Sequence, residues 1–219
     1  MNCAIIVFQG TNCDVDTYRA CELMEWSPKY VWHDETDLSS FDLVILPGGL
    51  SETGSLVHSR LAKLSPVMKA LKEYINQERG FVLGICNGFK MLCEEGFLPG
   101  ALLANSKNKF ICDDIEFIFT EYNVNRTIVL PIAHSEGKYY ADPKTLTELE
   151  DKDMVFLTYK LNPNGSICNI AGIYDREKKI IGITARPERA FHKELKLTDG
   201  RRIFDFIKSE LDDARSKAV

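Results

Sequence analysis

The chain has 219 residues, of which 45% are hydrophobic and 27% charged, a composition typical of one large globular domain that we expect to span residues 1–219. The formal net charge is −5, and acidic and basic residues are mixed without long blocks of one sign, which argues against a nucleic-acid surface. No apolar run approaches the roughly 20 residues that cross a bilayer, and no basic segment precedes the first apolar run, so we expect a cytoplasmic protein without membrane contact.

The first half of the chain alternates strand and helix patterns. Continuous apolar runs or short β-prone segments predict strands at Cys3–Phe8, Tyr30–Trp32, Leu43–Leu46 and Gly80–Leu83. Helices are predicted from Asp14 to about Met24, from Pro66 onward, and from the residues after Cys86 to about Gly96. For the second of these helices, Ser65 is the expected cap and Pro66 suits the first helical position.

The second half is richer in strands and ends in a helix. Strands are predicted at Ala101–Leu103, Lys109–Cys112, Ile115–Phe119, Thr127–Ile132, Met154–Tyr159, Ile170–Tyr174 and Ile180–Ile183. The helix after Gly200 is amphipathic, with a predicted buried face of Ile203, Phe206, Ile207 and Leu211. Unbroken apolar strands separated by helices predict an α/β fold, a mostly parallel open sheet flanked by helices.

A cysteine between two glycines, in the pentapeptide Gly84–Gly88, is the strongest functional signal. It directly follows the apolar run Phe81–Leu83 and leads into a predicted helix. Glycines permit a turn tight enough to present the Cys86 side chain, as in a nucleophile elbow. At a helix N-terminus, the dipole and the free N–H groups favour a thiolate and an oxyanion. We interpret Cys86 as a nucleophile; the alternative is a buried structural cysteine.

Backbone amides at a second strand end complete the predicted site. The turn Pro47–Gly49 follows an apolar strand, and the carboxyl ends of parallel strands meet at one edge of a sheet. We expect the N–H groups of Gly49, in the turn that includes Gly48, and of Asn87 to form an oxyanion hole. The alternative for this turn is a plain glycine turn without function.

The remaining cysteines give no sign of metal or redox chemistry. The chain has seven, scattered and without a Cys-x-x-Cys pair. In a cytoplasmic protein we expect most of them to be reduced, small core residues, and we expect no metal site.

Several segments besides the elbow share their pattern with a known family. These are Phe8–Asp14, Val31–His33 with Thr36–Leu38, Leu98–Leu103 with Phe110–Cys112, Pro131–Tyr139 and Pro187–Ala190. Together with Leu83–Phe89, they resemble the class I glutamine amidotransferases, and within them the glutaminase subunits of phosphoribosylformylglycinamidine synthase. The resemblance runs from about residue 3 to residue 190.

This resemblance implies a flavodoxin-like sheet with extra strands in the second half, and a subunit that hydrolyses glutamine. Ammonia would pass to an ATP-dependent synthetase subunit, which makes formylglycinamidine ribonucleotide in purine biosynthesis. A small accessory subunit is implied as a third member of the complex. No cofactor is implied for this chain, since ATP and magnesium belong to the synthetase partner.

The position of the family's catalytic histidine is occupied here by Arg186. The family segment reads Pro-His-Pro-Glu, whereas this chain has Ala185, Arg186 and Pro187 before Glu188, which keeps the position of the acid. A guanidinium with a pKa above about 12 does not cycle a proton near neutrality. Loss of a general base costs roughly 10²- to 10⁴-fold in rate. Arg186 can still hold Cys86 as a thiolate by its charge and form an ion pair with Glu188.

Two further departures from the family are the segment Leu50–Leu56, which lacks the family's aromatic and acidic residues, and Ser135 in place of a glycine. The first departure removes aromatic and acidic groups, which puts substrate contacts or partner docking in doubt. For two histidines an alternative is catalysis in place of the missing base: we expect His192 at the surface, unless a rearranged loop brings it to the site, and His134 in a structural or interface role. His33 is expected in a turn and His58 in a loop.

Two other functions remain open. The chain can be a catalytically impaired relative that acts as a binding or scaffolding subunit, which Arg186 and the altered segment after Gly49 suggest. It can also be an unrelated hydrolase of the same architecture, because a fold alone does not fix a function.

Overall fold

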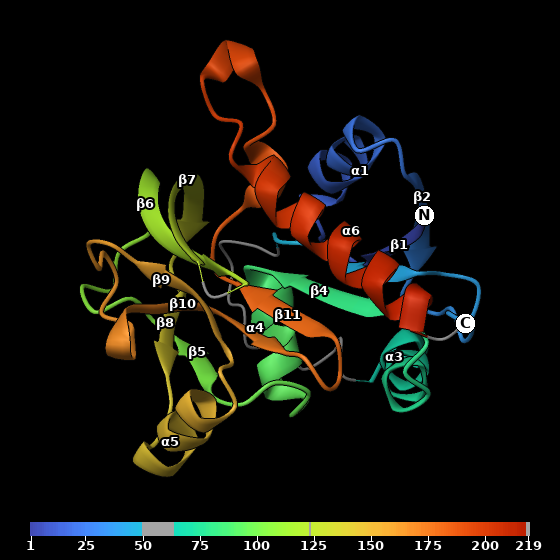
Figure 1. Cartoon of the computed structure of the whole chain (residues 1–219), viewed down its shortest axis with the longest axis horizontal. Helices are drawn as coiled ribbons and strands as arrows, with labels where there is room; N and C mark the ends of the chain where they lie inside the picture. Colours follow the sequence, from blue (N-terminus) through green and yellow to red (C-terminus); the bar gives the residue numbers. More distant parts are fainter. Residues whose placement is uncertain (50–63, 123, 218–219) are drawn as a thin grey trace.

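The computed structural model describes residues 1–49, 64–122 and 124–217. One nine-stranded sheet forms its centre, with helices on both faces (Figure 1). In order across the sheet lie β2 (Ser27–Trp32), β1 (Asn2–Val7), β3 (Leu43–Leu46), β4 (Phe81–Ile85), β11 (Ile180–Ile183), β10 (Ile170–Asp175), β9 (Val155–Tyr159), β6 (Ile111–Glu121) and β7 (Val124–His134). The α/β architecture predicted from the sequence is confirmed.

The first five strands of this order are parallel to one another. Every residue of β3 and β4 is buried, as expected where helices cover both faces of a sheet. The strands predicted at Leu43–Leu46 and Ile180–Ile183 have the predicted bounds. β4 continues past its predicted end to Ile85, so that the strand reaches the residue before Cys86.

The other four strands extend the sheet by antiparallel pairing. We predicted two strands in the region of β6, at Lys109–Cys112 and Ile115–Phe119, and this prediction is wrong. Residues 111–121 form one strand that pairs with β7 without a break in register. Asp113 and Asp114, which interrupt the apolar pattern, are exposed, so their carboxylates stay hydrated while the backbone continues the ladder.

In the described part of the chain, two helices cover each face of the parallel half. α1 (Asp14–Leu23) and α6 (Gly200–Lys217) pack on one face, and α3 (Pro66–Asn76) and α4 (Asn87–Glu94) pack on the other. Adjacent residues of β4 divide between them: Leu83 packs with α1 and α6, and Val82 packs with α3 and α4. The face predicted for the last helix is confirmed as buried, at Ile203, Phe206, Ile207 and Leu211.

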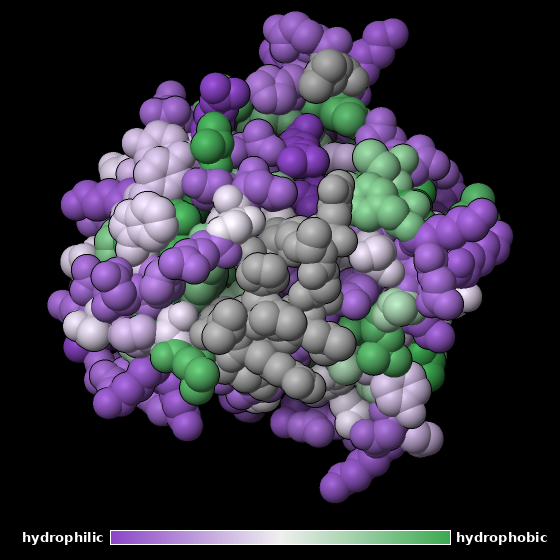
Figure 2. Space-filling view, turned by 180° about the vertical axis from the view of Figure 1, so that it is seen from behind, coloured by the Kyte–Doolittle hydropathy of each residue, from purple (hydrophilic) through white to green (hydrophobic). Residues whose placement is uncertain are grey.

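Smaller elements complete the fold. A two-stranded sheet pairs β5 (Ala101–Leu103) with β8 (Lys138–Tyr140), and α5 (Pro143–Asp151) follows β8. The described residues also form the 3₁₀-helices η1 (Ile167–Asn169), η2 (Pro187–Arg189) and η3 (Lys193–Leu195). On the face shown in Figure 2, hydrophilic residues predominate and hydrophobic ones appear in small separate groups. None of the helices in the described part of the chain has the length and hydrophobicity that a membrane crossing needs.

Candidate active site

Cys86 lies at the junction between β4 and α4, where the sequence predicted an elbow. Its backbone has φ 52° and ψ −103°, a combination that residues with a side chain seldom adopt and that often marks functional sites. The Cys86 amide donates to the Ile183 carbonyl of β11 at 2.7 Å, which fixes the junction to the sheet. A Cβ atom on Gly88 would lie 2.0 Å from the Leu46 carbonyl oxygen. The glycine therefore lets the start of α4 approach the end of β3.

The predicted glycine turn lies beside the cysteine. A Cβ atom on Gly48 would be 3.4 Å from the Cys86 Cβ and 3.3 Å from Nη1 of Arg186. Gly49 has φ +86°, and a Cβ there would overlap the Asn12 side chain. The backbone amide of Asn87 hydrogen-bonds to the Cys86 sulfur and lowers the pKa of its thiol. The structure thus brings both predicted turns to one place.

Arg186 reaches from the end of β11 to both a thiol and the backbone of β7. Its Nη2 donates to the Ala133 carbonyl at 3.0 Å and lies 3.8 Å from Sγ of Cys86. Its Nη1 donates to Sγ of Cys13, which lies just before α1. The Arg186 amide is fixed in turn by the Pro131 carbonyl at 2.8 Å. The guanidinium therefore sits between two buried sulfur atoms.

The protonation of Cys86 differs from the thiolate that we expected. Burial raises the pKa of its thiol, the charge of Arg186 lowers it, and the charge of Glu188 raises it again. The net shift is upward, because desolvation of a thiolate outweighs the attraction of the neighbouring guanidinium. The free protein therefore holds Cys86 as a thiol near neutrality.

Glu188 keeps the position of the acid, but it does not form the ion pair that we expected with Arg186. Its side chain is 2% exposed, and neither carboxylate oxygen has a hydrogen-bond partner in another described residue. Burial raises the pKa of Glu188 to about 7, and the charge of Arg186 only partly offsets this. The guanidinium is engaged elsewhere, because both of its terminal nitrogens point to sulfur or carbonyl acceptors.

Among the described residues, no histidine forms a hydrogen bond with the Cys86 sulfur. His134 is 4% exposed, and burial, with the charge of Arg186, lowers the pKa of its imidazole to about 4. The backbone of Gly137 packs against the ring, which fits a structural role. His33 stacks on Phe8 with ring centroids 6.5 Å apart. His58 lies outside the described residues, as does the divergent segment Leu50–Leu56.

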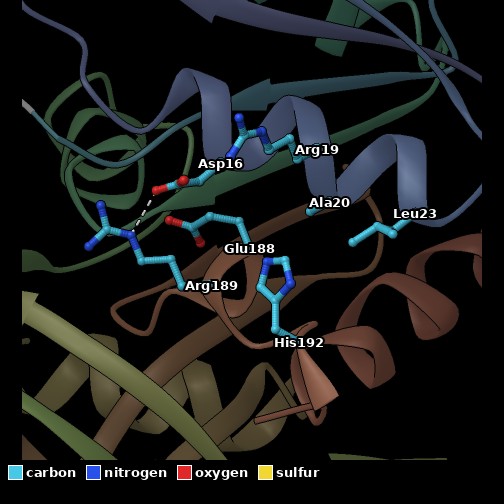
Figure 3. Close-up of a pocket in the computed structure, with 7 residues that line it drawn as sticks. All are labelled: Asp16, Arg19, Ala20, Leu23, Glu188, Arg189 and His192. Atoms are coloured by element: carbon cyan, nitrogen blue, oxygen red, sulfur yellow. Dashed lines mark hydrogen bonds and ion pairs between the residues drawn. The ribbon is translucent and has the colours of Figure 1, made fainter. Parts of the chain in front are cut away.

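His192 lies on a pocket next to the site. This pocket, of about 260 Å³, is lined by Asp16, Arg19, Ala20 and Leu23 of α1 and by Glu188, Arg189 and His192. Figure 3 shows the side chains of Glu188 and His192 on the same wall, both extending toward α1. Arg189 donates to Asp16 at 2.9 Å across the same space. His192 is exposed, as predicted, and neither Cys86 nor Arg186 lines this pocket.

Sequence reasoning missed Cys13 as a member of the site, because it was assigned to the core. A signal was available, since Cys13 follows β1, which pairs in parallel with β3, and the carboxyl ends of both strands lie at the same edge. Within the described ranges, no group of three or more histidine, cysteine or acidic side chains is arranged to hold a metal ion.

Comparison with known proteins places this arrangement in a family. The family profile of the CobB/CobQ-like glutamine amidotransferase domain matches residues 1–201. A protein of Prochlorococcus marinus, phosphoribosylformylglycinamidine synthase subunit PurQ, is 44% identical over 205 residues, which cover 90% of this chain and 92% of the relative. The subunit PurQ of a Nostoc species is 44% identical over 214 residues, which cover 93% of this chain and 95% of the relative.

A solved structure agrees with these relatives. A chain in the structure of PurLQS from Thermotoga maritima superposes with a TM-score of 0.85 at 32% identity, covering 96% of this chain and 98% of that one. The family predicted from the sequence is confirmed. This chain belongs to the CobB/CobQ-like glutamine amidotransferase family, and within it to the PurQ-like glutaminase subunits of phosphoribosylformylglycinamidine synthase.

Proposed function

We propose that this chain releases ammonia from glutamine for a synthetase partner that makes formylglycinamidine ribonucleotide in purine biosynthesis, with Cys86 as the nucleophile. The observation that carries the assignment of Cys86 is its place at the strand–helix junction, with φ 52° and its sulfur next to the Asn87 amide. The PurQ relatives and the PurLQS structure support a synthetase partner, and we further propose a small accessory subunit in the complex.

The proposed chemistry has two steps. Sγ of Cys86 attacks the side-chain amide carbon of glutamine, the C–N bond breaks, and ammonia leaves with the proton that the thiol gives up. Water then cleaves the thioester, which yields glutamate and restores the thiol. The N–H groups of Asn87 and Gly49 are the proposed donors to the oxyanion in both steps. ATP and magnesium are used by the synthetase partner, and this chain needs no cofactor.

Proton transfer is the weak point of this site. Arg186 stays charged, because the nearby thiols and Glu188 raise its pKa further despite its burial, so it does not carry a proton between sulfur and nitrogen. The pKa of Glu188, about 7, suits proton transfer, but its carboxylate has no hydrogen bond to the sulfur. We therefore expect slow turnover, with a glutamyl thioester on Cys86 that persists.

A second candidate function is a scaffolding subunit in a complex that uses free ammonia. The contact of Arg186 with both Cys13 and Cys86 favours it, because the guanidinium occupies the space next to the nucleophile. In this case the chain would hold the complex together without hydrolysing glutamine.

The test is ammonia release from glutamine in the presence of the synthetase partner, with parent, Cys86→Ala and Arg186→His proteins compared. We expect slow release by the parent, none by Cys86→Ala, and a gain of roughly 10²-fold or more in Arg186→His. Intact mass after saturating glutamine should show a glutamyl adduct on the parent only. A parent without adduct or ammonia, beside an active Arg186→His protein, would favour the scaffolding function. Unchanged release by Cys86→Ala would contradict the proposed nucleophile.

A further inference from the structure

Cys13 is a buried thiol that two guanidinium groups share. Its side chain is 0% exposed, and its sulfur accepts from Nη1 of Arg186 and, at 3.3 Å, from Nη2 of Arg189. Its own S–H points to Oδ1 of Asn12 at 3.2 Å. All three directions of the sulfur are therefore used, one as a donor and two as an acceptor.

A neutral thiol is an unusual anchor for an arginine that has a carboxylate nearby. Glu188 lies close enough for its negative charge to raise the pKa of Arg186, yet its oxygens receive no hydrogen bond from the guanidinium. Arg186 instead donates from Nη1 to Cys13 and from Nη2 to the Ala133 carbonyl, and Nη2 lies 3.8 Å from Sγ of Cys86. The position of the charge next to Cys86 therefore depends on what holds Nη1.

The loop that carries Cys13 also contacts the glycine turn. Oδ1 of Asn12 accepts the hydrogen bond from the Cys13 thiol. The same oxygen packs against Gly49, since a Cβ atom on Gly49 would lie 1.7 Å from it. One short segment at the end of β1 thus contacts both the guanidinium and the turn proposed for the oxyanion. This contact links the geometry of two parts of the site.

We propose that Cys13 is a positioning residue that holds the Arg186 guanidinium against Cys86 and away from Glu188. The proposal rests on the proposed role of Cys86 as the reactive thiol. Without the Cys13 sulfur, Nη1 loses its acceptor, and the carboxylate of Glu188, which is ionised above a pH of about 7, becomes the better partner. The guanidinium then moves away from Cys86, whose thiolate loses a stabilising charge.

The test is the rate at which iodoacetamide alkylates Cys86, measured between pH 6 and pH 10 by mass spectrometry of its peptide. Peptide-level detection is needed because Cys112 and Cys168 are exposed and free. For Cys13→Ala we expect a fall on the order of tenfold below the thiolate plateau, equal to a midpoint about one pH unit higher. Cys13→Ser keeps a hydroxyl that can donate to Asn12 and accept from Arg186, so it should stay close to the parent.

Two controls separate positioning from loss of structure. Cys21→Ala removes an equally buried thiol from α1, outside the site, and should leave the Cys86 midpoint unchanged. In an Arg186→Met background, Cys13→Ala should have no further effect, because the charge that it positions is absent. Melting curves of all variants show which of them fold.

The outcomes are distinct. An unchanged midpoint in folded Cys13→Ala would overturn the proposal, and so would an equal loss in the Arg186→Met background. If Cys13→Ala does not fold, Cys13→Val, which fills the space but accepts no hydrogen bond from Arg186, takes its place, and an unchanged midpoint in folded Cys13→Val would overturn the proposal. A parent that makes no glutamyl adduct, but shows the expected alkylation pattern, would contradict the proposed hydrolysis and leave the role of Cys13 standing.

Discussion

At the scale of single residues, burial shifts the pKa values of the site more than neighbouring charges do. Desolvation is the largest influence on Cys86, Glu188 and His134, and it favours the neutral form of each. Arg186 attracts Cys86 and Glu188, but its influence is second in both cases. The site is consequently less ionised than its sequence suggests.

Glu188 gives a prediction about stability and pH. Its pKa is about 7 in the folded protein and 4.5 in a solvated side chain, so between these values the folded state holds a proton that the unfolded state has lost. The contribution of Glu188 to the free energy of unfolding is therefore fully present below pH 4.5 and is lost as the pH rises through 7. The total loss is up to about 3 kcal/mol. Glu188→Gln stays neutral and should be more stable than the parent at pH 8.

Urea unfolding at pH 5, 6, 7 and 8 measures this effect. The control is Glu150→Gln, which changes an exposed side chain of α5 in the same way. Parallel stability curves for parent and Glu188→Gln over this pH range would mean that Glu188 is not held neutral by burial.

At the scale of elements, the site depends on the close approach of α4 to β3. Gly88 sits at the start of α4 directly over the Leu46 carbonyl, a rigid backbone group that cannot turn aside as a flexible side chain can. The elbow at Cys86 needs this approach, because residue 88 follows it by half a helical turn.

Gly88→Ala should therefore cost about 2 kcal/mol or more in the free energy of unfolding and change the alkylation rate of Cys86. The matched control is Gly96→Ala, where a Cβ meets no atom within 4 Å but φ is +72°. That variant should lose about 1 kcal/mol, from backbone strain alone, and leave Cys86 unchanged. Equal losses from both substitutions in urea unfolding would show that the contact with β3 is easily relieved.

Most elements of the sheet could be predicted from sequence, because buried parallel strands are continuous apolar runs. The strand at residues 43–46, for example, could be predicted from its apolar run alone. Helix α5 was not predicted: it is only nine residues long, and Leu149 is the one residue of it that is buried. Its start did carry a signal, because Asp142 accepts from the Lys144 and Thr145 amides and precedes a proline at the first helical position.

The site was predictable where its geometry is local and not where it depends on packing. Cys86 and its flanking glycines specify their own turn. The contact of Arg186 with Cys13 joins residues 173 positions apart, and no local pattern encodes it. The expected pairing of Arg186 with Glu188 rested on charge alone, which does not fix the direction of a long side chain.

At the scale of the whole molecule, one continuous sheet links the parallel and antiparallel halves through β11 and β10. The core on the α1 and α6 face runs without interruption from Cys3 in β1 to Phe119 in β6. Among the residues that the structure describes, this core is shared by both halves of the sheet.

We therefore predict that the chain unfolds in one cooperative transition, as a single domain does. Trp26 is a suitable probe, because it is buried and its ring centroid lies 5.5 Å from that of Phe204. Tryptophan fluorescence and far-ultraviolet circular dichroism should give the same midpoint in urea. Separate midpoints, or a plateau between two steps, would indicate that the antiparallel half unfolds independently.

The backbone at residue 186 is held in place independently of its side chain. Its amide is held by the Pro131 carbonyl of β7, whatever side chain the residue carries. The position of the backbone at this point of the site therefore does not depend on the chemistry of the side chain. We therefore expect an exchange of arginine for histidine at this position to alter the chemistry of the site without rebuilding the fold.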